Sequence, residues 1–131
     1  MGKKTTIIIL ITGFSLFAVA FTNTLADKAV NLKVLPKDIG EHVLDDIMVK
    51  DCGEALGVKC NYCHVQDKAT EKFDYASDAI AIKDTARSMM RMTLELNKKY
   101  FGNTKPAIGD KAMVVTCYTC HRGDAVPKEN K

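Results

Sequence analysis

Two short sequences of identical design constrain this chain more than any other feature. Residues 60–64 read Cys-Asn-Tyr-Cys-His, and residues 117–121 read Cys-Tyr-Thr-Cys-His. In each, two cysteines separated by two residues are followed at once by histidine, which is the spacing of covalent c-type haem attachment. Two thiols about one helical turn apart match the two vinyl groups on one edge of a haem, and the next residue projects toward the iron.

We therefore predict two haem c groups, one on the first motif (residues 60–64) and one on the second motif (residues 117–121). Neutral imidazole is the usual proximal ligand of such an iron. The expected thioether residues are Cys60, Cys63, Cys117 and Cys120, and the expected proximal ligands are His64 and His121.

Three other uses of paired cysteines fit this pattern less well. Disulfides suit an exported protein but give no reason for a histidine after both pairs. A zinc site needs two pairs roughly 15–20 residues apart, and the gap between Cys63 and Cys117 is far longer. A thioredoxin-like pair needs a βαβ setting, and no strand pattern surrounds either motif. The fifth cysteine, Cys52, is interpreted as a small buried residue rather than a reactive thiol.

The N-terminus has the layout of a secretory signal peptide. Two lysines precede an uncharged apolar run over residues 7–21, and Ala26 stands just before the first acidic residue. This pattern predicts export with cleavage after Ala26, or alternatively after Ala20. An uncleaved anchor is the other interpretation, although the run is shorter than the ~20 residues of a spanning helix. We expect a signal peptide over 1–26 and one dihaem domain over 27–131, in the periplasm or on the outer face of the inner membrane.

The charge balance gives no indication of nucleic-acid binding. With residues 1–26 removed, basic and acidic residues are nearly equal in number, so no strongly basic surface is expected. A domain of this size buries a modest fraction of its surface and often needs a covalent or cofactor staple. Two covalently held macrocycles would supply much of the core, and the haem-free chain is expected not to fold stably.

A first helix is predicted from the Pro36-Lys37-Asp38 sequence, since proline suits the first turn and aspartate the cap. It runs to about Leu56, where Gly57 ends it. Its apolar positions recur every four residues. They are Leu44, Met48, Cys52 and Leu56.

A second helix is predicted from Ser77 or Asp78 to about Phe101, because apolar positions recur at helical spacing on one face. That face consists of Ile82, Ala86, Met89, Thr93, Leu96 and Tyr100. The segments 65–76 and 103–115 read as polar loops. The predicted fold class is all-α, with few helices and long loops wrapped around two covalently bound haems, as in multihaem cytochromes c.

Each helix carries a methionine ahead of a motif, and two irons need sixth ligands. A methionine on a helix stripe more often packs in a core, but His42 is the only other histidine of the chain. Met48 and Met89 are therefore the predicted sixth ligands, with His42 as the alternative to one of them. Methionine ligation raises the reduction potential relative to two histidines.

Three segments carry a resemblance to a known family: residues 56–64, 86–97 and 115–123 resemble the cytochrome c subunit of photosynthetic reaction centres. In that family a helix presents a methionine to one side of each haem, and the attachment motif lies on the other. The resemblance implies that Met89 is the ligand of the second haem and Met48 that of the first. The family subunit carries four haems in two similar halves, and this chain corresponds to one half.

The predicted function is electron transfer, with the irons cycling between ferric and ferrous forms. Irons with protein ligands on both faces leave no position open for a substrate, so the chain is not expected to be an enzyme. Expected partners are redox proteins, membrane-associated respiratory or photosynthetic complexes among them, with no nucleic acid and no small-molecule substrate. The alternatives are a small haem enzyme of the peroxidase or nitrogen-oxide reductase type, or a haem-based sensor. Both require an open iron position.

Overall fold

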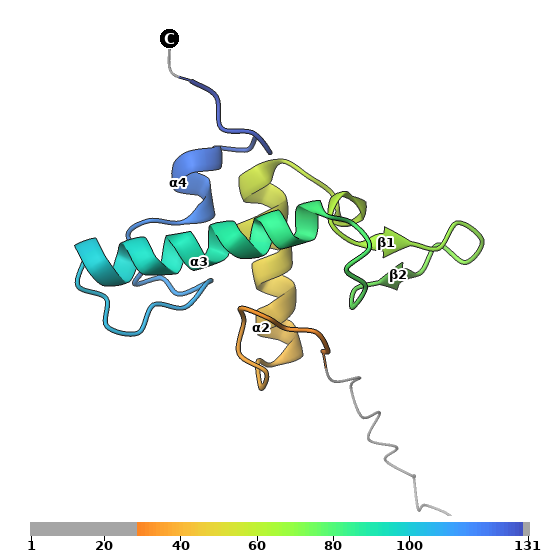
Figure 1. Cartoon of the computed structure of the whole chain (residues 1–131), viewed down its shortest axis with the longest axis horizontal. Helices are drawn as coiled ribbons and strands as arrows, with labels where there is room; N and C mark the ends of the chain where they lie inside the picture. The colour runs from red at the N-terminus through yellow and green to blue at the C-terminus, as the bar shows by residue number, and fades with distance from the viewer. Residues whose placement is uncertain (1–28, 130–131) are drawn as a thin grey trace, which may run out of the picture.

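The computed structural model describes residues 29–129. The long helix α3 (Ile82–Tyr100) crosses an earlier helix that begins with α2 (Glu41–Asp46) and continues through a π-helical segment (Ile47–Glu54). Figure 1 shows the short ribbon β1–β2 on one side of this crossing and the short helix α4 (Cys117–His121) on the other. Within the described part of the chain, no helix combines the length and apolarity needed to cross a membrane.

The first helix begins later than its sequence predicts. It starts at Glu41, after Gly40, whose backbone is extended, so the predicted start at residues 36–38 is wrong. The Pro36 carbonyl instead accepts the N–H of Ile39 at 3.3 Å in a separate turn. The predicted end is confirmed, because Gly57 adopts a φ of +65° that only glycine takes at little cost.

The middle of that helix is π-helical over Ile47–Glu54. A π-helix carries its hydrogen bonds from i to i+5 and is rare, occurring frequently at functional sites. Both Met48 and Cys52 lie in this segment and pack, partly buried, against the core. The wider coil therefore places the predicted methionine ligand of the first haem in an unusual part of the backbone.

The second helix also begins later than predicted, at Ile82 rather than at Ser77 or Asp78. The Ser77 hydroxyl accepts the N–H of Ala79 at 3.2 Å, which makes a turn instead of a helix cap. The Asp78 carboxylate is occupied by Lys33, at 2.7 Å. The predicted end near Phe101 is confirmed, since α3 ends at Tyr100.

The buried face of α3 differs from the predicted apolar stripe. The residues that are buried in this helix are Lys83, Arg87, Met90, Thr93 and Asn97. Met90 is 9% exposed and packs in the core, whereas Met89 is 44% exposed. An apolar count could not find this face, because four of its five members are polar and are buried by virtue of their hydrogen bonds and ion pairs.

A small antiparallel ribbon lies where the sequence predicts only a polar loop. Strand β1 (Val65–Gln66) pairs with β2 (Phe73–Asp74), with Val65 opposite Asp74. The turn is held by the Asp67 carboxylate, which accepts the N–H groups of Ala69 and Thr70 at 2.9 and 2.7 Å. The all-α prediction is therefore confirmed only in part, since helices and loops dominate but two short strands are present.

The apolar core lies at the helix crossing. It joins the N-terminal segment, the π-helical segment, α3 and the loop that leads to α4. Its buried members are Leu35, Ile47, Met90, Ile108 and Met113. The core is small, and several large apolar side chains remain exposed on the surface of the protein.

Candidate functional site

The second motif forms helix α4 (Cys117–His121). The helix starts with a capping box, in which the Thr119 hydroxyl accepts the Thr116 N–H at 3.0 Å. Residues at i, i+3 and i+4 share one face of a helix, so Cys117, Cys120 and His121 lie on the same side. The sequence spacing alone therefore presents two thiols and one imidazole to a single ligand.

The imidazole of His121 is held in one orientation. Its Nδ1 donates a hydrogen bond to the Asp124 carbonyl at 2.9 Å. A histidine whose Nδ1 carries the proton has a free lone pair on Nε2, and this backbone contact is a common way of fixing an iron-binding or zinc-binding tautomer. The loop after α4 thus leaves Nε2 of His121 free to bind a metal ion.

The first motif begins with a tighter turn, a 3-10 helix over Cys60–Tyr62. The His64 N–H donates to the Cys60 carbonyl at 2.9 Å, which closes the turn between the first cysteine and the histidine. The ring of His64 packs edge-on against Tyr75, with ring centroids 5.0 Å apart. Tyr75 in turn stacks on Phe73 of β2 at 5.5 Å, so the ribbon supports this imidazole.

The charge state of His64 suits iron binding. Burial, and next the nearby charge of Lys83, lower the pKa of His64. The neutral imidazole that results near pH 7 is the form that ligates a metal. Its Nδ1 is buried and makes no well-aligned hydrogen bond with any described residue, although the Tyr75 carbonyl raises the pKa of His64 slightly against the larger effects.

All five cysteines carry free thiols. Cys60 and Cys120 are exposed, whereas Cys63 and Cys117 are half-buried, and burial raises the pKa of both half-buried thiols. Within the described residues, no three side chains of the His, Cys, Asp and Glu types lie close enough together to hold a metal ion by themselves.

The residues present fit a haem at each motif. Each motif offers two thiols and one imidazole, and one imidazole has its tautomer fixed by a backbone carbonyl. Exposed apolar and aromatic side chains supply the kind of surface that a macrocycle covers. They are Tyr62, Tyr75, Met89, Met92, Tyr100, Phe101 and Tyr118.

The predicted sixth ligands lie in different environments. Met48 is half-buried in the π-helical segment and packs against the core. Met89 is exposed on α3, next in the chain to the core residue Met90. The alternative ligand, His42, is exposed in the first turns of α2.

Asn97 ties helix α3 to the segment that leads into the second motif. It is fully buried, at 0% exposure. Its Oδ1 accepts the N–H groups of Val114 and Val115 at 2.8 and 3.1 Å. Its Nδ2 donates to the carbonyls of Val115 and Thr93 at 2.7 and 2.9 Å. All these bonds are buried or partly buried, so Asn97 fixes the register between the helix that carries Met89 and the approach to Cys117.

The end of the first helix also contacts the end of the second motif. The N–H of Gly123 donates to the Ala55 carbonyl at 2.9 Å. A Cβ at Gly57 would collide with the Gly123 carbonyl. Glycine is therefore required at position 57 both for its positive φ and for this close approach of two backbones.

Charged groups surround the first motif. Arg87, 7% exposed, donates to the carboxylates of Asp78 and Asp84 at 2.7 and 2.6 Å. It also donates to the Asn31 carbonyl at 3.2 Å. The Lys33 ammonium binds the other oxygen of Asp78. Hydrogen bonds from Lys33, Asn31 and Arg87 hold the pKa of Asp78 far below its usual range.

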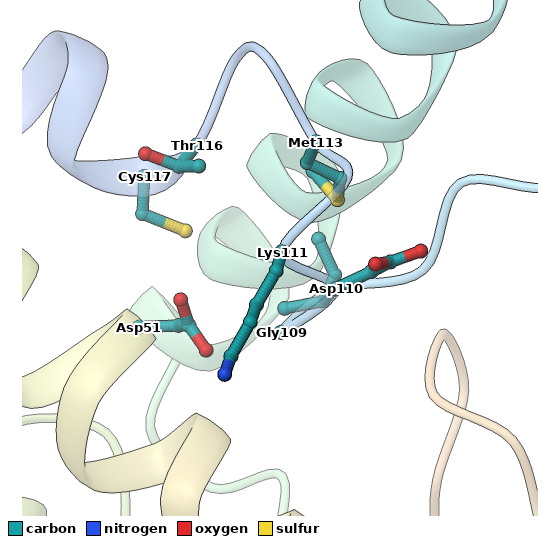
Figure 2. Close-up of a pocket in the computed structure, with 8 residues that line it drawn as sticks. Asp51, Gly109, Asp110, Lys111, Met113, Thr116 and Cys117 are labelled. Carbon is teal, nitrogen blue, oxygen red and sulfur yellow. The ribbon is translucent and has the colours of Figure 1, made fainter. Parts of the chain in front are cut away.

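A pocket of about 200 Å³ adjoins the second motif. Figure 2 shows the Asp51 carboxylate and the Cys117 thiol directed into it from two different elements, with Thr116 beside Cys117 and Met113 across the pocket. Burial raises the pKa of Asp51. Because a Cβ at Gly109 would meet the side chain of Ile47, the loop can approach the π-helical segment closely only with glycine at that position.

Cys52 is partly buried near both motifs. Burial, followed by the proximity of Cys117, raises the pKa of its thiol to about 12. A thiol with such a pKa stays protonated at neutral pH and is a poor nucleophile. This agrees with its interpretation as a small buried residue.

Sequence reasoning missed four residues of these surroundings: Asn97, Lys83, Asp51 and Tyr75. The available signal was the spacing of polar residues on α3, because Lys83, Arg87 and Asn97 recur at helical intervals with Met90. Polar residues that share a helix face are usually read as its solvated side. Here this polar face is buried instead, because distant segments of the chain supply its hydrogen-bond and ion-pair partners.

Two Cys-x-x-Cys-His motifs beside methionine-bearing helices define this protein as one of c-type cytochrome design. The family model for the photosynthetic reaction centre cytochrome C subunit matches residues 23–130. The chain belongs to this family.

Three relatives are each described as a photosynthetic reaction center cytochrome c subunit. The protein of Rubrivivax gelatinosus is 39% identical over 70 residues, that of Roseobacter denitrificans 38% over 72, and that of Thermochromatium tepidum 39% over 69. Each match covers 53% of this chain but only 16%, 17% and 14% of the respective relative. The chain thus spans a minor part of their length. No solved structure matches it significantly.

Proposed function

We propose that this chain is an exported dihaem c-type cytochrome that transfers electrons between redox proteins. The observation that carries the proposal is the duplicated motif, with one imidazole fixed for ligation by the His121–Asp124 hydrogen bond. Membership of the reaction centre cytochrome family supports it.

Within this proposal, Cys60, Cys63, Cys117 and Cys120 form the thioether bonds, and His64 and His121 bind the two irons. When bound, haem supplies one-electron chemistry at iron. The chain's own part is to hold each imidazole in a fixed orientation, and to fix the relation of the motifs to the helices. Tyr75 and Asp124 do this for His64 and His121, respectively.

Met48 and Met89 are proposed as sixth ligands. Met89 is exposed on α3, the helix whose register with the second motif Asn97 fixes. Met48 precedes the first motif on the helix that ends at Gly57. A methionine on the face opposite each histidine would close both irons to substrates and favour electron transfer over catalysis.

Location and partners are also proposals. Residues 1–26 carry the expected signal peptide and lie outside the described residues, and cleavage after Ala26 would release residues 27–131. Partners are then redox proteins met on the outer side of the cytoplasmic membrane, including membrane-associated respiratory or photosynthetic complexes.

Visible spectroscopy of the purified holoprotein tests the proposal. A carrier with two methionine-ligated haems shows the far-red sulfur-to-iron band when ferric and does not bind carbon monoxide when ferrous. Met89→Ala should open one haem to carbon monoxide and weaken the band, whereas Met92→Ala, on the same helix and similarly exposed, should do neither. Rapid carbon monoxide binding by the unmodified protein would contradict the carrier and favour the enzyme or sensor.

A further inference from the structure

A buried lysine lies beside the first motif. Lys83, in the first turn of α3, is 9% exposed. Its ammonium donates to the carbonyls of Tyr75 and Ser77 at 2.7 and 2.6 Å. Because the Tyr75 ring packs against His64, the ammonium and the imidazole of the proximal ligand contact the same residue. A partly desolvated cation is thereby fixed near the His64 imidazole.

Nearby carboxylates do not cancel this charge. Asp78 lies 3.6 Å from the Lys83 ammonium but also pairs with Lys33 and Arg87 at 2.7 Å each. Asp84 pairs with Arg87 and is mostly exposed. Three cations therefore face two carboxylates, and the two most buried members are Lys83 and Arg87. Charges in the protein interior are screened less than charges in water, so the net field at the first motif is positive.

The second motif faces a charge of opposite sign. The half-buried Asp51 carboxylate lines the pocket beside Cys117 (Figure 2). Within the described chain, no cation forms an ion pair with Asp51. Asp110 and Lys111 line the same pocket and are exposed. One turn earlier, Asp46 and Lys50 pair with each other. Figure 2 shows the Lys111 side chain extending toward Asp51, but the two carboxylates that line the pocket still outnumber its one ammonium.

We propose that Lys83 and Asp51 set the two haems at different reduction potentials, with the haem of the first motif the higher. This rests on the proposed function. A fixed cation favours the reduced iron, which carries one more electron, and a fixed anion disfavours it. With haem bound at both motifs, an electron would pass from the ferrous haem of the second motif to the ferric haem of the first. No proton and no ligand moves, and a one-electron protein donor and acceptor complete the path.

Redox potentiometry of the holoprotein at pH 8, followed by visible absorbance, tests this assignment. We expect two one-electron waves. Lys83→Met should shift the higher wave to lower potential by ~59 mV. For one electron this corresponds to a tenfold change in the equilibrium constant for reduction. Asp51→Asn should move the lower wave upward. Lys83→Arg, which keeps the charge, should leave the higher wave in place.

Lys59→Met is the matched control, since it removes an exposed lysine next to the same motif and should shift the waves much less. A shift as large as that of Lys83→Met would contradict the role of burial. The proposal is overturned if Lys83→Met moves neither wave or the lower one, or if both variants move the same wave. If Lys83→Met does not fold, Asp51→Asn and Lys83→Arg decide alone. Coincident waves in the unmodified protein would also overturn the proposal, whereas the absence of any reversible one-electron wave would instead refute the proposed function.

Discussion

Around the first motif, distant segments are joined by charged groups, whereas around the second they are joined by an uncharged amide and by backbone contacts. Arg87 links α3 to Asp78 and to the N-terminal segment at Asn31. Asn97 links the same helix to Val114 and Val115. One helix thus serves both motifs by two kinds of chemistry. Ion pairs respond to pH and salt, but buried amide bonds respond mainly to geometry.

The largest effect is expected at Asn97. Asn97→Leu should lower the free energy of unfolding of the holoprotein by about 3 kcal/mol, because backbone groups of Val114 and Val115 lose their buried partner. Denaturant unfolding measures this. Asn97→Asp keeps the acceptor but turns a buried carboxylate oxygen toward the carbonyls of Thr93 and Val115, so its loss should be at least as large. An unchanged midpoint for Asn97→Leu would remove the distinction between the two regions.

Removal of the Arg87 guanidinium should have a smaller effect. Arg87→Met should lower the free energy of unfolding by about 2 kcal/mol. The loss is smaller than at Asn97 because the carboxylates that pair with Arg87 are partly exposed and become hydrated when the guanidinium is removed. The loss should shrink in high salt, whereas that of Asn97→Leu should not. Thermal unfolding at two salt concentrations checks both variants. Equal salt dependence in the two would break the comparison.

Acid should weaken the first region before the second. The pKa of Asp78 is lowered by hydrogen bonds from Lys33, Asn31 and Arg87. A lowered pKa gives stability that is present above the unfolded value, near 3.9, and is lost as the pH falls toward the folded value. The unfolding midpoint of the unmodified protein should therefore decrease when the pH is lowered below about 4. In Asp78→Asn this decrease should be smaller. An identical acid slope in this variant would argue against the ion-pair network.

The smallest effect is expected at Cys52, which lies near both motifs. With a pKa of about 12, its thiol should resist alkylation of the holoprotein at pH 8. Cys52→Ala should cost about 1 kcal/mol, since it removes one small buried group. Mass spectrometry after iodoacetamide treatment measures the first and thermal unfolding the second. Rapid labelling of the folded protein would show an accessible thiol.

The sequence predicted the motifs, two helices and both helix ends, because each depends on local patterns. Gly57 and the residues after Tyr100 mark helix ends by their own backbone preferences. The helix starts were wrong because Asp38 and Asp78, which look like caps, are not used as caps. Their alternatives involve residues elsewhere in the chain, such as Lys33 for Asp78, and no local pattern contains them.

The candidate site was predictable to a similar extent. Spacing alone points to the four thiols and two histidines of the motifs, whereas the residues that contact and surround them were not found. Lys83 is buried because two carbonyls from the segment before α3 receive its ammonium. Asn97 is buried because Val114 and Val115 need its amide. Such polar burial depends on tertiary partners, which periodicity does not reveal.

The number of haems per chain tests the central claim most directly. Intact mass of the purified protein, combined with its pyridine haemochrome spectrum, counts covalently bound haem and shows whether residues 1–26 have been removed. Two haems per chain on a protein that begins after Ala26 is the predicted result. One haem, or none, in protein matured by a competent host would contradict the assignment of a haem to each motif.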